Sequence, residues 1–563
     1  MTARERAEDF IRNEKQFHLG FLPTEQSNPK SATLEADFRR NSADGVRTLQ
    51  NVDRDVLVMA KRVFASERYA ELERAMLSVL RAGGRIVFSG CGATGRLSIL
   101  LESMWRTACR DLGERFPAMR RYADRVFSIM TGGDFALVKS VEFFEDYACF
   151  GRRQVRELDF SDRDLLVAIT EGGETSSVLG TVSEAADRGG RVFLLFNNPA
   201  DLLAERLERS RNAIRDPRVC VLDLSCGPMA LAGSTRMQAT TSEQLIAGGA
   251  LESVFCALAG IPRHDYAAEF GVLLDLLEKE ETRRVIADYI DFEEDVYAKG
   301  GRITYFAHDF MLDLFTDTTE RSPTFMLPPF RGASDRTGAR SWAFVKDPLA
   351  STPKTWQWNM ARPLRCLAWT MDDYRAMGVA DRIAAPPKIA EADLLDFKIG
   401  NEPAPDRSEH PEDAAVVFAF GAEGGGRVFR SACAEAASAF RTVRTLAPAG
   451  KNGDFALPGL RETPAETAPL RLMDHLEVKQ LLNTISTGVM TKNGRVSGNW
   501  MSYVALSNKK LIDRGIRLVA ELGGLSYEEA AVRVFSAMEE TAELPPGAER
   551  ISAVQYALKK TGR

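Results

Sequence analysis

The chain has 563 residues, and a single hydrophobic core rarely grows beyond about 250–300 residues, so two or more domains are expected. It is 45% hydrophobic and 27% charged with a formal net charge of −6. This balance is typical of a globular protein and argues against a general nucleic-acid-binding surface, which needs an excess of basic residues. The eight cysteines form no Cys-x-x-Cys pair and no His-Glu-x-x-His motif occurs, so we expect no disulfide framework, no metal site and no cofactor.

The N-terminal residues 1–15 are densely charged and lack the apolar stretch of a signal peptide. No uninterrupted apolar run is long enough to span a bilayer. We therefore expect a cytoplasmic protein without a membrane partner.

The first half of the chain alternates between strand-like and helix-like segments. Residues 1–54 are polar and mixed, and residues 53–82 carry apolar side chains at helical spacing. Five short apolar runs follow, with helix-like stretches such as residues 175–188 between them. These runs are residues 85–89, 126–130, 165–169, 191–196 and 219–224. Strands that alternate with helices predict a doubly wound parallel sheet.

The same alternation restarts after a helical stretch at residues 242–298. The strand-like runs of this half are residues 302–306, 341–345, 364–370, 416–420 and 442–446. Residues 401–413 are typical of a loop, and the chain from residue 477 is mostly helical with breaks at Gly494 and near Pro545. Because the Gly-Gly-Arg-Ile start of residues 83–86 recurs at residues 300–303, an internal duplication is plausible. The predicted parts are residues 1–54, 55–250, 251–476 and 477–563.

A glycine-rich turn at residues 90–96 follows the first predicted strand and opens a helix. Glycines let a backbone approach an anion closely, and the free N–H groups of a helix N-terminus bind phosphate. A tight structural turn or a dinucleotide site would give the same local pattern. No acidic ribose-binding signature follows at the third strand-like run, which argues against the dinucleotide.

Two further turns carry glycines and hydroxyls, at residues 170–177 and 233–236. Each alone is better explained as helix capping. Three such turns in one predicted domain favour a phosphate site. The candidate ligand-binding residues are Gly92, Ala93, Thr94, Gly95, Arg96, Gly172, Gly173, Thr175, Ser234, Thr235 and Arg236.

These motifs together resemble a known family. Residues 90–97, 173–175 and 227–237 are similar to sugar-isomerase (SIS) domain proteins, and more narrowly to N-acetylmuramic acid 6-phosphate etherase and to the double-length glucokinase regulatory protein. Residues 24–31, 479–488 and 507–511 resemble the ends of the same proteins. The resemblance implies two SIS-type, flavodoxin-like α/β domains and a C-terminal helical lid region. It covers residues 24–250 and 475–540 well and is thinner across residues 280–470.

The resemblance also assigns roles to two glutamates. Glu145 matches a catalytic acid–base residue of the etherase, although a glutamate on a helix is usually only a solvated surface group. Residues 317–325 match a second functional run, with Glu320 in the functional place, where the first domain has Met104. Lys479 matches a lysine of the regulatory protein that contacts phosphate.

The counterpart of the glycine turn in the second half, residues 307–311, has no glycine and carries an acid. The two halves have therefore lost complementary groups. The resemblance then implies one phosphate site between two domains, with Glu320 supplied by the second, degenerate domain.

Some residues depart from the family pattern. Gly172 stands in place of a serine, Glu174 in place of an arginine or small residue, Ala93 in place of a threonine, and Gln238 in place of a lysine. Each change removes a phosphate ligand, so the affinity or the substrate is expected to differ.

Three functions fit the resemblance. The first is a carbon–oxygen lyase of amino sugar metabolism, in which Glu145 and Glu320 eliminate lactate from a 6-phosphorylated amino sugar. The second is a non-catalytic regulator that senses a sugar phosphate and has a sugar kinase as its partner. An aldose–ketose isomerase fits the fold, but no histidine lies in a recognised motif. We favour the lyase, as a monomer acting as an internal pseudo-dimer or with further self-association.

Overall fold

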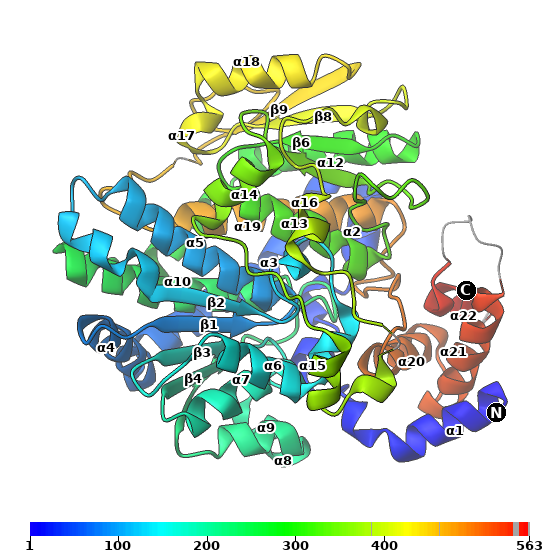
Figure 1. Ribbon diagram of the computed structural model, residues 1–563. Coiled ribbons are helices and arrows are strands. Elements are labelled where there is room, and N and C mark those ends of the chain that lie inside the picture. The colour runs from blue at the N-terminus through cyan, green and yellow to red at the C-terminus, as the bar shows by residue number, and fades with distance from the viewer. Residues whose placement is uncertain (384, 461, 544–550, 561–563) are drawn as a thin grey trace.

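The computed structural model describes residues 1–383, 385–460, 462–543 and 551–560 (Figure 1). Its framework is a pair of five-stranded sheets in which all neighbouring strands are parallel. The first sheet has the order β2-β1-β3-β4-β5. Its strands are β1 (Ile86–Gly90), β2 (Val126–Met130), β3 (Leu165–Ile169), β4 (Arg191–Phe196) and β5 (Val219–Asp223).

The second sheet repeats the order of the first, as β7-β6-β8-β9-β10. Its strands are β6 (Ile303–Phe306), β7 (Ala343–Lys346), β8 (Ala414–Phe418), β9 (Thr442–Pro448) and β10 (Phe455–Leu457). The register is also repeated, because Ile86 starts the pairing of β1 with both of its neighbours and Ile303 does the same for β6. The predicted class, two doubly wound parallel α/β sheets followed by a helical C-terminal region, is confirmed.

Helices cover both faces of the first sheet. The helices of the first half of the chain are α1 (Ala3–Asn13), α2 (Leu34–Arg40), α3 (Ser42–Phe64), α4 (Glu67–Arg81), α5 (Ala93–Asp111), α6 (Ala148–Glu157), α7 (Ser176–Asp187), α8 (Ala200–Arg206), α9 (Glu208–Ile214) and α10 (Gln238–Ala259). Side chains alternate across β1: Ile86 and Phe88 join the main core with α5 and α10, while Val87 joins the smaller core under α7.

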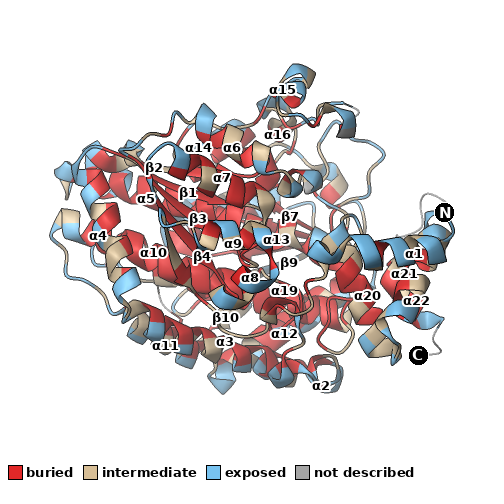
Figure 2. Ribbon diagram, turned by 90° about the horizontal axis from the view of Figure 1, so that it is seen from below, coloured by how far each residue is buried: buried red, intermediate tan, exposed pale blue. Residues whose placement is uncertain are grey.

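In the second half the helices are α11 (Tyr266–Leu277), α12 (Glu280–Ala298), α13 (Met311–Phe325), α14 (Thr352–Met360), α15 (Met371–Ala376), α16 (Glu391–Leu395), α17 (Gly421–Gly424), α18 (Arg427–Ala436), α19 (Leu472–Lys492), α20 (Lys509–Gly523), α21 (Tyr527–Ala542) and α22 (Ala553–Lys559). One continuous apolar core runs from the first sheet through α10 and α19 to the second sheet. Figure 2 shows the strands and α19 as mostly buried. The two sheets are therefore joined by a shared core.

Helices α20, α21 and α22 lie with α1 at one side of the molecule (Figure 1). The predicted break near Pro545 falls outside the described residues. Among the residues that are described, no helix has both the length and the apolar character needed to cross a membrane.

Two segments differ from the prediction. Residues 364–370 were expected to be a strand, and they form an extended crossing segment instead. Its apolar side chains pack on the first half of the chain, where the Trp369 ring stacks on the ring of Phe144. The stretch predicted as one helix at residues 53–82 is two helices, because Ser66 caps a new helix by accepting a hydrogen bond from the N–H of Tyr69.

Candidate functional site

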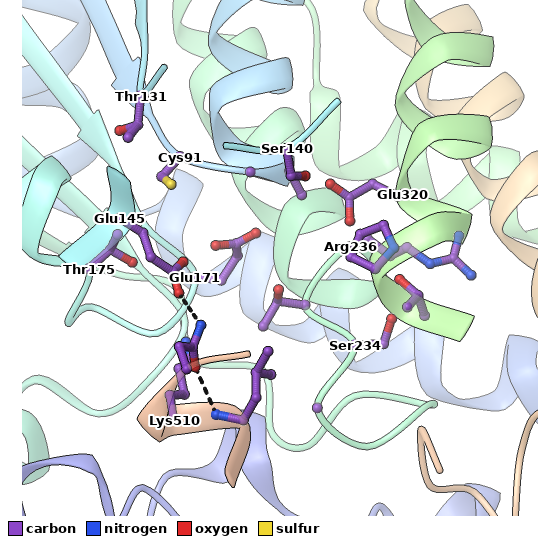
Figure 3. A pocket seen from close by; sticks show the side chains of 18 of the residues that line it. Cys91, Thr131, Ser140, Glu145, Glu171, Thr175, Ser234, Arg236, Glu320 and Lys510 are labelled. Carbon is purple, nitrogen blue, oxygen red and sulfur yellow. Dashed lines mark hydrogen bonds between the residues drawn. The ribbon is translucent and has the colours of Figure 1, made fainter. Parts of the chain in front are cut away.

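A cavity of about 210 Å³ lies where β1, β2 and β3 end (Figure 3). In a parallel sheet with this strand order, ligands bind at the carboxyl ends of the strands, at the point where the order reverses. The walls of this cavity come from the turns after β1, β2 and β3, from residues 233–236, from α13 and from residues 501–514. The site therefore combines side chains of both halves of the chain and of the C-terminal region.

The turn between β1 and α5 brings Gly92 and Ala93 to the cavity wall. Gly90 must be glycine, because a Cβ there would lie 2.4 Å from the carbonyl carbon of Thr94. No side chain caps the N-terminus of α5. Its first N–H groups are therefore available to an anion, which fits the predicted phosphate role of this turn.

Three predicted residues of this turn do not line the cavity. The hydroxyl of Thr94 is used inside the turn, where it accepts from the N–H of Cys91 at 3.0 Å and donates to the carbonyl of Cys91 at 2.9 Å. Gly95 packs against the side chain of Met130. The buried Arg96 donates to the carbonyl oxygens of Leu137 and Ala136 and forms an ion pair with Glu320. Arg96 thus positions Glu320 from behind the wall, and its direct contact with a ligand stays a prediction.

Replacing Gly92 by alanine should separate anion binding from stability. Gly92 has a φ of +56° and a Cβ there would meet no heavy atom within 4 Å, so the methyl group would occupy the space next to the open helix N-terminus. We expect Gly92→Ala to weaken hexose 6-phosphate binding by roughly tenfold or more, since each charge-assisted hydrogen bond contributes about 1.5–3 kcal/mol. Isothermal titration calorimetry measures this change.

Gly83→Ala is the matched control. Gly83 has a φ of +81°, also with open space around it, but it lies in the turn before β1, away from the cavity. Both variants should lose stability, on the order of 1–3 kcal/mol, because each places a Cβ at a positive φ. Equal affinities of the two variants would exclude a role of the β1–α5 turn in anion binding.

The turn after β3 contributes Thr175 and Glu171 to the wall. The Thr175 hydroxyl accepts a hydrogen bond from that of Thr170 at 3.0 Å. Gly172 and Gly173 were predicted to bind the ligand, but they lie behind the wall. Gly173, at a φ of +74°, packs against other side chains, because a Cβ there would lie 2.5 Å from the side chain of Leu203.

The turn before α10 places Ser234, Thr235 and Arg236 at the cavity, as predicted. The buried Ser234 hydroxyl has no hydrogen-bonding partner in the described part of the chain, and neither has Nε of Arg236. The other nitrogens of Arg236 are engaged, with one at 3.0 Å from Asp317 of α13. Ser234 is therefore the hydroxyl best placed to meet a ligand.

Lys479 does not line the cavity. Its ammonium lies behind the turn before α10, where it donates to the carbonyl of Arg236 at 2.9 Å and to the Thr241 hydroxyl at 2.8 Å. Burial, together with the neighbouring charge of Arg236, lowers the pKa of Lys479 to about 7. Lys479 thus supports the turn that carries Ser234 from behind, and its contact with a phosphate stays a prediction.

Glu145 lies at the cavity wall, where its Oε1 accepts a hydrogen bond at 2.8 Å from the amide of Asn508. Burial raises the pKa of Glu145 to about 7; Lys510 opposes the shift, and Glu174 and Asp146 add to it. A carboxyl group in this range can hold or release a proton near neutral pH.

Glu320 reaches the same cavity from α13, and its side chain is 12% exposed. It is thus brought to Glu145 from the other half of the chain, as the sequence predicted. Met104, at the corresponding place in the first half, is buried in the core. The nearby Glu102 is also buried and pairs with Arg106, Arg362 and Arg365.

Sequence reasoning missed Glu171, Asn508 and Lys510 as cavity residues. Lys510 forms an ion pair with Glu174 at 2.8 Å. The signal for Asn508 and Lys510 was present in residues 507–511, which were noted for their family resemblance and were not placed in the site. Glu171 had no such signal, because its turn was assessed for glycines and hydroxyls.

The corresponding turn of the second sheet is filled by a side chain. The Asp309 carboxylate accepts a hydrogen bond at 2.8 Å from the N–H of Glu423, at the start of α17. It lies so close to Gly421 that a Cβ there would be 2.1 Å from it. A carboxylate therefore occupies the place that corresponds to an anion. No cluster of three or more metal-ligating side chains occurs among the described residues.

Part of the chain is similar in sequence to a known protein family. Residues 69–186 match the family model of the glucokinase regulatory protein N-terminal SIS domain. Residues 69–186 are thus similar to an SIS domain, and the predicted resemblance is confirmed.

The similar curated proteins are etherases. The chain is 29% identical over 229 residues to N-acetylmuramic acid 6-phosphate etherase 1 of Bacillus licheniformis, covering 41% of this chain and 67% of that one. It is 28% identical over 228 residues to the N-acetylmuramic acid 6-phosphate etherase of Glaesserella parasuis, covering 40% and 66%. The chain therefore spans about two thirds of the length of these relatives.

A solved structure, the tagatose-6-phosphate ketose/aldose isomerase from Escherichia coli, is similar with 12% identity and a TM-score of 0.42. The match covers 80% of this chain and 95% of that one.

Proposed function

We propose that this protein binds a 6-phosphorylated amino sugar in the cavity and eliminates lactate from it, as an etherase-type lyase. The observation that carries the proposal is Glu145, a partly buried carboxyl group with a pKa of about 7 in the wall of a cavity that also presents an uncapped helix N-terminus. The similarity to proteins named N-acetylmuramic acid 6-phosphate etherase supports the substrate class.

The proposed reaction starts from the open-chain sugar, whose C1 aldehyde acidifies the proton on C2. The Glu145 carboxylate takes this proton, and the electron pair of the C2–H bond moves toward the aldehyde. The C3–O bond then breaks and lactate leaves with that bond's electron pair. Water adds at C3, and C2 regains a proton, so the sum is ether plus water giving alcohol and lactate.

Arg96 and Glu320 have the second role in the proposed reaction, which is to protonate the leaving group. Because the Arg96 guanidinium holds one carboxylate oxygen of Glu320, the orientation of Glu320 is fixed at the cavity wall. A fixed carboxyl group can deliver a proton to the departing lactate oxygen without first reorienting. Glu145 is the proposed base and Glu320 the proposed acid.

Lactate release tests the proposal directly. Purified full-length protein incubated with N-acetylmuramic acid 6-phosphate is expected to release D-lactate, detected with a lactate dehydrogenase assay. Heat-denatured protein serves as the blank. Folded protein that binds the sugar phosphate and releases no lactate would contradict the lyase function.

That same outcome would support a second candidate, a regulator that binds a sugar phosphate and controls a sugar kinase. The specific observation in its favour is the match of residues 69–186 to the SIS domain of a regulatory protein. For this function we expect binding without turnover, and a kinase that co-purifies in a manner dependent on the sugar phosphate.

A further inference from the structure

The charges in the cavity wall are unbalanced. Three cationic side chains line the cavity, and each is already paired with a carboxylate that does not line it: Arg236 with Asp317, Lys510 with Glu174 and Arg514 with Glu25. Among the carboxylates of the wall, Glu320 is paired with Arg96. Glu145 and Glu171 form no ion pair within the described part of the chain.

Glu171 is the carboxylate that sequence reasoning did not anticipate. It follows β3 directly, is only 8% exposed and lines the cavity. In the view of Figure 3 its carboxylate lies between those of Glu145 and Glu320. Burial, with a smaller contribution from the charge of Glu320, raises the pKa of Glu171 to about 7, although the charge of Lys510 and a hydrogen bond with Thr235 oppose the shift.

A phosphate dianion alone would not compensate these charges. It would add negative charge to a wall whose two unpaired ionisable groups are carboxyl groups. A buried carboxylate without a cation beside it is costly to ionise, and a ligand that supplies a cation recovers that cost on binding. Complementarity of charge therefore favours a ligand that carries a positive group as well as a phosphate.

We propose that the ligand carries a free, positively charged amino group and that Glu171 binds it. This inference rests on the proposed function, because the phosphorylated sugar is taken from there, and within that substrate class it predicts a preference for sugars with a free amino group over acetylated ones. For the elimination, the substrate with the free amino group is expected to have the lower KM.

Three hexose phosphates test the inference by calorimetry near neutral pH. Glucosamine 6-phosphate and glucose 6-phosphate differ in an amino group against a hydroxyl, and N-acetylglucosamine 6-phosphate keeps the nitrogen without its charge. We expect full-length wild-type protein to bind glucosamine 6-phosphate roughly 10- to 100-fold more tightly than the other two, the range of one charge-assisted hydrogen bond.

Glu171→Gln should remove this preference, since the amide has the same shape without the charge. Glu208→Gln, on the exposed surface of α9, is the matched control and should keep it. Equal binding of the three sugars by wild-type protein, or an unchanged preference in Glu171→Gln, would overturn the inference and leave the proposed function standing. Absence of binding by all three would instead contradict both.

Discussion

Replacement of Glu145 by glutamine is expected to lower the rate of lactate release by roughly 10²–10⁴-fold, the usual contribution of a general base. Glutamine keeps the shape of the side chain, and its amide oxygen can still accept the hydrogen bond from Asn508. Binding of the sugar phosphate should therefore change little while kcat falls. Steady-state kinetics together with calorimetry separate the two quantities.

The pH dependence of the rate of lactate release gives an independent measure of the ionisation of Glu145. The base must be ionised to act, and the pKa of Glu145 is raised to about 7. The rate should therefore be low below this pH and rise as the pH passes through about 7. An ordinary glutamate would give the same rise near pH 4.3.

Asp146→Asn is the control for this prediction. Asp146 is the next residue, it is exposed and it does not line the cavity. Its negative charge contributes to the raised pKa of Glu145, so the variant should stay active with its pH midpoint slightly lowered. If Glu145→Gln released lactate at the wild-type rate, another group would have to be the base.

Replacement of Arg362 by methionine is expected to lower the free energy of unfolding by about 3–5 kcal/mol, the effect of breaking a buried ion pair by removing one partner. Arg362 lies two residues before the crossing segment and binds both oxygens of Asp134, at 2.7 and 2.8 Å, and one oxygen of Glu102 at 3.0 Å. The side chain of each partner is at most 4% exposed. The substitution leaves two buried carboxylates without their main cation.

Urea unfolding at neutral pH measures this loss. Burial alone would raise the pKa of Glu102, but Arg362 and Arg365 hold it at about 2. Because the pKa is lower in the folded state, the stabilisation is present at neutral pH and is lost as the pH falls toward 2. The difference between variant and wild type should therefore shrink in acid.

Arg375→Met provides the comparison on the surface. The Arg375 side chain is 65% exposed and pairs with Asp372, and exposed pairs contribute at most about 1 kcal/mol. Similar midpoints for the two variants would mean that the ion pairs of Arg362 do not hold the halves of the molecule together.

Most of the framework could be predicted from the sequence. The strands β2, β3 and β4 coincide with their predicted runs, because a buried parallel strand is a short, nearly continuous apolar run that needs no knowledge of its neighbours. The run at residues 364–370 looks the same, yet its side chains pack on the other half of the chain. β10 has three residues, too few to form a pattern.

Some residues of the candidate site could likewise be predicted from the sequence, and others could not. The glycine turn at Gly92 and the glutamates Glu145 and Glu320 could be found from the sequence, because a turn is local and the family motifs are specific. The places of Lys479, Lys510 and Glu171 could not. Lys479 and Lys510 both belong to the helical C-terminal region, and only its packing against the turn before α10 turns one ammonium to the backbone and the other to the cavity wall.

The sequence by itself thus determined the repeated α/β architecture, the phosphate-type turn and the pair of acid–base candidates. The tertiary structure decided which charges face the cavity and which are neutralised behind it. The physical reason is that helix, strand and turn signals depend on neighbouring residues. The balance of charge in a cavity depends instead on pairs such as Arg96 with Glu320 and Arg514 with Glu25, whose members are far apart in the chain.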